Sequence, residues 1–170
     1  MRSATTFLLA VSLVALRSRA DGDEPNAAPS VEWIRTFGGT THAVANSVVE
    51  TTDGDYVVAG ARGSELLLAR VGASGDILWE RTPGAGINDF GYSVTETADG
   101  GFIVAGAAAH PAQVKFDVYL LKTDARGTAQ WESTIDTGSD EKALSVRQTA
   151  DISSPARPSR AGSASATFTW

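Results

Sequence analysis

Clustered carboxylates are the first candidates for chemistry in this sequence. Asp53, Gly54 and Asp55 place two carboxylates around a glycine, which suits calcium because this hard cation prefers oxygen ligands. A complete calcium loop would continue with more oxygen ligands and a distal glutamate, whereas here the chain passes directly into an expected strand at 56–59. Asp-Gly also supplies the positive φ of a tight hairpin turn, so we predict a turn. We interpret Asn88-Asp89 and 136–140 as polar turns in the same way.

The histidines, the repeated serines and a glycine-rich segment are further candidate sites. His42 and His110 lie in predicted loops of different repeats, and a metal site or acid–base pair needs convergent partners. The glycine-rich segment 84–91 lacks the lysine and the strand-to-helix context of a phosphate loop. Three serines recur at one repeat position, which favours a structural hydrogen bond over a nucleophile, since catalysis needs only one. They are Ser47, Ser93 and Ser145. We therefore predict no catalytic, cofactor-binding or metal-binding residue, and a protein that is not an enzyme.

Three tryptophans mark the repeat that must position these residues. Trp33, Trp79 and Trp131 are 46 and 52 residues apart, and the three serines keep the same spacings. Matching landmarks at matching offsets indicate an internal repeat. Because large aromatic side chains are mostly buried, we interpret the tryptophans as core between repeats, and not as a stacking platform for sugars.

Within each repeat, apolar residues alternate or form short runs bounded by glycine and aspartate, as in strands. In the second repeat we expect strands at 92–97, 102–107, 118–123 and 128–134. Equivalent turn and strand residues recur in both repeats: Asp53, Gly54, Asp99, Gly100, Gly60, Gly106, Gly75 and Gly127. Four antiparallel strands at a period of 46 to 52 residues are typical of a propeller blade. The sequence therefore predicts an all-β chain of tandem four-stranded antiparallel β-propeller blades, incomplete at about two and a half blades.

These residues resemble a known group. The patterns W-x-R-T-x-G, S-V-x-E-T-x-D-G and D-V-Y-L-L-K-T-D-x-x-G-x-x-x-W resemble the secreted β-propeller repeats of bacteria and archaea, which sit near the quinoprotein and WD-repeat families. The resemblance covers 33–151. The segment from Asp124 to Trp131 is similar to the tryptophan-docking motif of quinoprotein blades, where the indole packs between neighbouring blades. The first repeat carries Gly72 in place of that aspartate. The resemblance thus implies a blade type and secretion, and not a quinoprotein enzyme.

The N-terminus predicts a secretory signal peptide. Arg2 precedes an apolar run at 7–16, and Ser18 and Ala20 are spaced like a cleavage site. That run is about half of the roughly 20 residues that a membrane-spanning helix needs. We expect residues 1–20 to be removed, the protein to be secreted, and 21–32 to form a flexible leader. Cleavage removes three arginines and takes the net charge from −6 to −9, which disfavours a nucleic-acid partner.

The expected blade repeats occupy 33–78, 79–130 and, in part, 131–151. The segment 152–170 has no acidic residue and no strand-like alternation, so we predict a disordered tail. Codons for this segment, read in another frame, can encode the blade pattern. We therefore interpret the segment as the product of a frameshift. The sequence predicts a non-catalytic secreted scaffold or binding module from a truncated gene, with an unknown ligand and self-association through exposed blade faces. The alternatives are a fragment without independent function and a quinoprotein-like enzyme.

Overall fold

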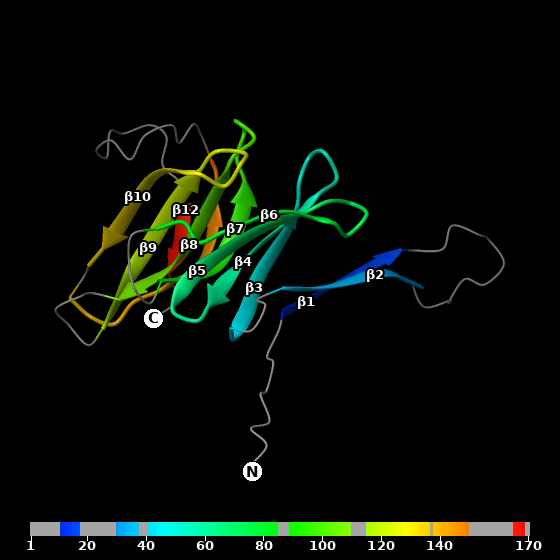
Figure 1. Ribbon diagram of the computed structural model, residues 1–170. Helices are drawn as coiled ribbons and strands as arrows, with labels where there is room; N and C mark the ends of the chain where they lie inside the picture. The colour runs from blue at the N-terminus through cyan, green and yellow to red at the C-terminus, as the bar shows by residue number, and fades with distance from the viewer. Residues whose placement is uncertain are drawn as a thin grey trace, which may run out of the picture.

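The computed structural model describes residues 11–17, 30–37, 41–84, 89–109, 115–136, 138–149 and 165–168. These segments contain twelve strands and no helix, and therefore no helix of the length and hydrophobicity needed to cross a membrane. Two four-stranded antiparallel sheets make up most of the structure (Figure 1), and they do not close into a ring. The predicted all-β class and the two four-stranded antiparallel units are confirmed.

Each four-stranded sheet is a simple meander in which sequence neighbours pair. The first sheet comprises β3 (Ala43–Glu50), β4 (Tyr56–Arg62), β5 (Glu65–Val71) and β6 (Ile77–Arg81). The second comprises β7 (Asp89–Glu96), β8 (Phe102–Ala109), β9 (Phe116–Thr123) and β10 (Ala129–Ile135). The sheet boundaries are shifted relative to the expected repeats at 33–78 and 79–130, because each tryptophan lies in the last strand of a sheet and not at the start of the next.

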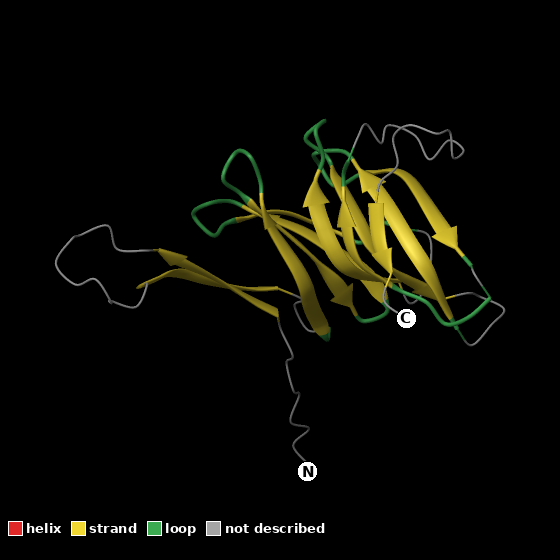
Figure 2. Ribbon diagram, turned by 180° about the vertical axis from the view of Figure 1, so that it is seen from behind, coloured by secondary structure: helices red, strands yellow, loops and turns green. Residues whose placement is uncertain are grey.

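Two further strand pairs flank the sheets. β1 (Val11–Arg17) pairs with β2 (Ser30–Phe37) in a hairpin that projects away from the sheets (Figures 1 and 2). β1 lies within the predicted signal peptide and β2 begins within the predicted leader, so cleavage after Ala20 would separate the two strands. β11 (Ala143–Arg147) pairs with β12 (Ser165–Phe168). The sequence analysis expects no strand in that tail, but the unpaired edge of β11 offers backbone hydrogen-bonding groups to an extended segment.

Four of the connections in the two sheets, those after β3, β5, β7 and β9, share one turn geometry. In the turn after β3, the Thr51 N–H donates to Asp55 O at 2.8 Å and the Gly54 N–H donates back to Thr51 O at 2.9 Å. The same two bonds close the turns that contain Gly75, Gly100 and Gly127. These four glycines have φ between 75° and 86°, which side chains disfavour. The predicted turn glycines therefore occupy the positive-φ positions that the sequence analysis expects.

Gly60 and Gly106 occupy equivalent positions in the second strand of each sheet. Each lies beside an irregularity in the first strand, between Ala45 and Ser47 in β3 and between Gly91 and Ser93 in β7. A Cβ atom at Gly60 would lie 1.9 Å from Val44 O, and one at Gly106 would lie 1.7 Å from Phe90 O. Only glycine lets the two strands approach this closely, which explains why both repeats carry it.

The main core lies between the two sheets. It joins Val57, Ala59, Leu66 and Leu68 of the first sheet to Phe102, Val104, Tyr119 and Leu121 of the second, all buried. Alternate residues on β5 and β9 face the opposite side, so Leu67 and Val118 belong to separate clusters. Each buried leucine or phenylalanine contributes about 1.5–3 kcal/mol of transfer free energy, and so the sheets are held mainly by this shared core.

Candidate functional site

A repeated serine hydrogen bond joins consecutive units. The Val94 N–H donates to Ser47 Oγ at 3.2 Å, and the Val146 N–H donates to Ser93 Oγ at 3.2 Å. Each serine lies in the first strand of one unit and receives the bond from the first strand of the next. The structural hydrogen bond predicted for this position is thus present at Ser47 and Ser93, and Ser145 lies in β11 as the third copy.

A second repeated bond was not recognised in the sequence. The Thr52 N–H donates to the Glu96 carboxylate at 2.8 Å, and the Ala98 N–H donates to Gln148 Oε1 at 2.8 Å. Glu96 and Gln148 are 52 residues apart, so the same spacing that relates Trp79 to Trp131 relates them. Their side chains differ in charge but both offer the acceptor oxygen that the turn N–H needs. The interfaces on the two sides of the second sheet therefore use equivalent contacts.

Trp33 and Trp79 each lie on a glycine turn of the four-stranded sheet that follows their strand. Trp33 donates its indole N–H to Ala73 O at 2.8 Å, and a Cβ at Gly75 would lie only 2.8 Å from its ring. Trp79 covers Gly127 in the same way. Trp33 also contacts Tyr56, at 5.7 Å between ring centroids, and Trp79 contacts Phe102 at 6.2 Å. Trp131 lies half-buried in β10, packed against the core on the far side of the second sheet.

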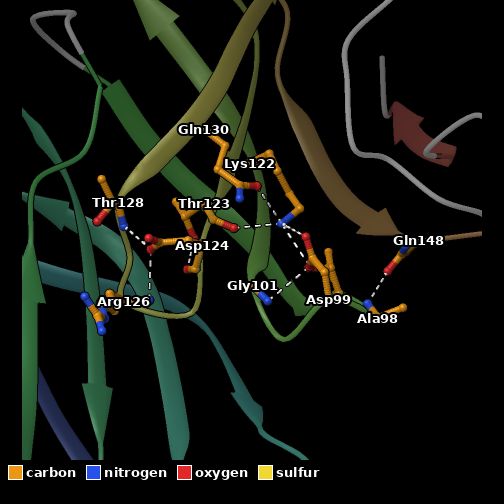
Figure 3. A network of polar contacts seen from close by, with 11 residues as sticks. Ala98, Asp99, Gly101, Lys122, Thr123, Asp124, Arg126, Thr128, Gln130 and Gln148 are labelled. Carbon is orange, nitrogen blue, oxygen red and sulfur yellow. Dashed lines mark hydrogen bonds and ion pairs between the residues drawn. The ribbon is translucent and has the colours of Figure 1, made fainter.

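The turn aspartate of the second sheet binds a buried lysine (Figure 3). Lys122 Nζ lies 2.9 Å from Asp99 Oδ2, 2.7 Å from Thr123 O and 3.1 Å from Gln130 Oε1. The Lys122 side chain is 1% exposed, so its charge depends on these acceptors. The hydrogen bond from Thr97, together with that from Lys122, lowers the pKa of Asp99 from 3.8 to about 2. The positive charge of Lys122 and the negative charge of Asp99 balance, and their contacts stabilise the hairpin between β7 and β8.

In the first sheet, an arginine binds the turn aspartates. Arg70 Nε donates to Asp55 Oδ2 at 2.8 Å, and its terminal nitrogen contacts Asp53 Oδ2 at 2.5 Å. The hydrogen bond from Thr51, with a further contribution from Arg70, lowers the pKa of Asp53. The two carboxylates weighed as calcium ligands are therefore bound to one guanidinium, and Gly54 forms the predicted turn between them.

An open hollow of about 410 Å³ lies where the two sheets meet on their outer side. Arg62 and Glu80 form an ion pair of 3.0 Å in its lining, and the Arg81 guanidinium lies 6.0 Å from the Trp79 ring. The opposite wall is the turn at 127–129 of the second sheet. The hollow therefore presents paired charges of both signs to solvent.

Three carboxylates converge at the end of the second sheet. Oxygens of Asp117, Asp136 and Glu141 all lie within 4.8 Å of one another. Asp117 is 3% exposed and Glu141 8% exposed, while Asp136 reaches the surface. Three oxygens at this separation match the ligand spacing around a single hard cation. Of the groups described, this cluster is the one suited to hold a metal ion.

Backbone contacts bring these carboxylates together. Asp117 follows the first residue of β9, Asp136 follows β10, and Glu141 precedes β11. The Glu141 N–H donates to Phe116 O, and the Phe116 N–H donates to Asp140 Oδ1, both at 2.8 Å. The connection between β10 and β11 is thus tied to the start of β9. The sequence analysis singled out 136–140 but missed Asp117 and Glu141, because their contact depends on a connection whose path is not encoded in a local pattern.

Of the remaining candidates, those that the structure describes do not join this cluster. His42 is exposed and precedes β3, whereas His110 and Asn88 lie outside the described residues. Asp89 is buried at the start of β7, and its N–H donates to Ser64 O at 3.2 Å. Of the segment 84–91, residues 85–88 also lie outside the described part of the chain.

Comparisons with known proteins add no relative whose chemistry could be compared with these residues. Neither the family models nor the curated proteins contain a match to this chain.

Proposed function

We propose that this chain is a non-catalytic, secreted β-propeller repeat protein that acts as a scaffold or binding module. The observation that carries the proposal is the equivalence of the two interfaces on either side of the second sheet. Both use a serine hydroxyl and a Glu or Gln side chain at matching repeat positions. Units joined by the same contacts are related by the same rotation, and a constant rotation about one axis is the arrangement of propeller blades.

The exposed face of β3 supports self-association as part of this function. Val48, Val94 and Val146 occupy one repeat position, and they are 51%, 6% and 3% exposed. The preceding sheet covers Val94 and the second sheet covers Val146, which leaves Val48 as the uncovered copy. We propose that this face takes a unit of a second copy of the chain, in a head-to-tail contact that repeats the internal interface.

The hollow between the sheets is the proposed contact surface for a ligand of the module. It is formed by both sheets, so its shape depends on their stacking, and it presents Arg62, Glu80 and Arg81 beside an indole. Charged groups next to an aromatic ring are typical of sites that bind polar ligands with an apolar side.

Secretion and solution size test the proposal together. The full chain is expressed in a bacterial host, and the exported product is measured by intact mass and by light scattering after size exclusion. We expect a product that begins at Asp21 and forms one defined oligomer, which Val48→Asp converts to a monomer. Heterogeneous aggregates, or retention of the uncleaved chain inside the cell, would contradict a secreted module.

A further inference from the structure

We propose that Asp117, Asp136 and Glu141 form a calcium site at the junction of β9, β10 and the connection to β11. Their oxygens lie within 4.8 Å of one another. Two oxygens on opposite sides of one calcium ion are separated by about twice the Ca–O distance of 2.3–2.6 Å, so a single ion fits among the three. The site does not depend on how the two sheets stack, since all three ligands belong to the second sheet and its outgoing connection.

A buried carboxylate oxygen without a hydrogen bond is the second observation that points to a ligand. Asp117 is 97% buried, and its Oδ1 has no hydrogen-bond partner among the residues that the structure describes. An unpaired buried charge is costly, and two further carboxylates beside it raise that cost. Within the described residues, Lys115 approaches the cluster but contacts Asp136, at 3.1 Å. A divalent cation supplies the charge and the coordination that the Asp117 oxygen lacks.

The donor set selects calcium among the common metal ions. All three side chains offer hard carboxylate oxygens, and among the residues that the structure describes no nitrogen or sulfur ligand belongs to the cluster. Zinc sites are built mainly from nitrogen and sulfur ligands. Magnesium requires near-ideal octahedral geometry at 2.0–2.1 Å, whereas calcium accepts irregular sets with water in the remaining positions. The exposed side of the cluster, at Asp136, leaves room for such waters.

The first sheet provides an internal comparison. Residues 52 positions before the three ligands are Glu65, Gly84 and Asp89. Glu65 is exposed and Gly84 has no side chain, so only the buried carboxylate of Asp89 remains from the set. The three carboxylates of the calcium site therefore occur together in the second repeat and not at the equivalent positions of the first. Its effect is to fix the β10–β11 connection against the start of β9.

Calorimetric titration of the full chain with calcium chloride, after removal of bound metal with a chelator, tests the proposal. We expect one calcium ion per chain with a dissociation constant of about 10⁻⁴–10⁻³ M, the range of extracellular calcium modules. Asp117→Asn should weaken binding by about tenfold or more, because the charge count of the ligands sets the affinity. Glu65→Gln is the matched control, since it removes one negative charge at the equivalent exposed position and should leave binding unchanged.

A second variant keeps the proposal testable if the Asp117→Asn chain does not fold. Asp136→Asn changes the exposed ligand, so the chain should keep its far-ultraviolet circular dichroism spectrum while calcium binding weakens. The proposal is overturned if calcium does not bind, if both ligand variants bind as the unchanged chain does, or if Glu65→Gln weakens binding equally. Magnesium that binds as tightly as calcium would also overturn it. The absence of calcium binding would not change the oligomer measured by light scattering. The two experiments therefore test the calcium site and the proposed function separately.

Discussion

The two four-stranded sheets share a framework but neutralise their first hairpin turns differently. In the first sheet, Arg70 is 13% exposed and binds Asp53 and Asp55 with its planar guanidinium. In the second, Lys122 replaces the arginine and is 1% exposed, and glycine replaces the second aspartate. The compact ammonium group must therefore be satisfied by several acceptors from different residues. Both sheets therefore place a cation beside the first turn, but the cation is an arginine in one sheet and a lysine in the other, and its acceptors differ accordingly.

The same comparison extends to the ends of the sheets. Three carboxylates gather at the end of the second sheet, whereas the equivalent positions at the end of the first sheet are an exposed glutamate, a glycine and the buried Asp89 at the start of β7. The turn hydrogen bonds, the strand glycines and the contacts between units are kept, whereas the charged side chains beside the first turn and at the sheet end vary. Stability changes should therefore match between repeats at framework positions and differ at the two cation positions.

The largest expected difference concerns the two cations. Lys122→Ala should destabilise the chain by about 3 kcal/mol, because it leaves buried acceptors and Asp99 without their partner. Arg70→Ala should cost about 1–2 kcal/mol, since Asp53 remains solvated. Urea denaturation followed by tryptophan fluorescence measures both. Equal losses of stability in the two variants would contradict the claim that the buried lysine contributes more than the partly exposed arginine.

Alanine at the two strand glycines should give the next largest effect. Gly60→Ala and Gly106→Ala each place a methyl group against a carbonyl oxygen of the neighbouring strand. We expect a loss of about 2 kcal/mol for each, as for other overpacked sites, and the same value within error. Thermal unfolding of the two variants measures the losses. Gly72→Ala is a control for added volume, because its φ is not positive and a Cβ there makes only ordinary contacts, the nearest 3.6 Å from Leu78 Cδ2.

Removal of the serine hydroxyls should have a smaller effect. Ser47→Ala and Ser93→Ala each delete one acceptor for a backbone N–H, so we expect about 1 kcal/mol of destabilisation for each. Denaturant titration checks the two values. A loss at only one of the serines would show that the two interfaces are not equivalent.

The smallest effect concerns pH. The pKa of Asp99 is lowered from 3.8 to about 2 in the folded chain, so its contribution is complete above about pH 4 and is lost as pH falls through 2. Because the Asp99 side chain is 51% exposed, we expect this contribution to be at most about 1 kcal/mol. Stability measured between pH 5 and about pH 2 should fall less steeply in Asp99→Asn than in the unchanged chain. An identical slope would contradict the assignment.

Local patterns predicted the parts of the fold that local chemistry determines. Asp-Gly pairs, strand alternation and the spacing of tryptophans placed the four strands of the second sheet and one strand of the first, because turn conformation and sheet burial act within a few residues. β12 was missed, since its four residues become a strand only through pairing with β11. The carboxylate cluster was missed for a related reason. Its members come from three segments, and Asp117 reads in sequence as an ordinary residue at the start of a strand.

Hydrogen exchange at two backbone amides tests the equivalence of the interfaces most directly. The Val94 N–H is bonded to Ser47 and the Val146 N–H to Ser93. Nuclear magnetic resonance can follow both amides in one sample. We predict that Ser47→Ala accelerates exchange at Val94 more than at Val146, and that Ser93→Ala does the reverse. Exchange at Val146 that is unprotected in the unchanged chain, or indifferent to Ser93→Ala, would contradict a second interface built like the first.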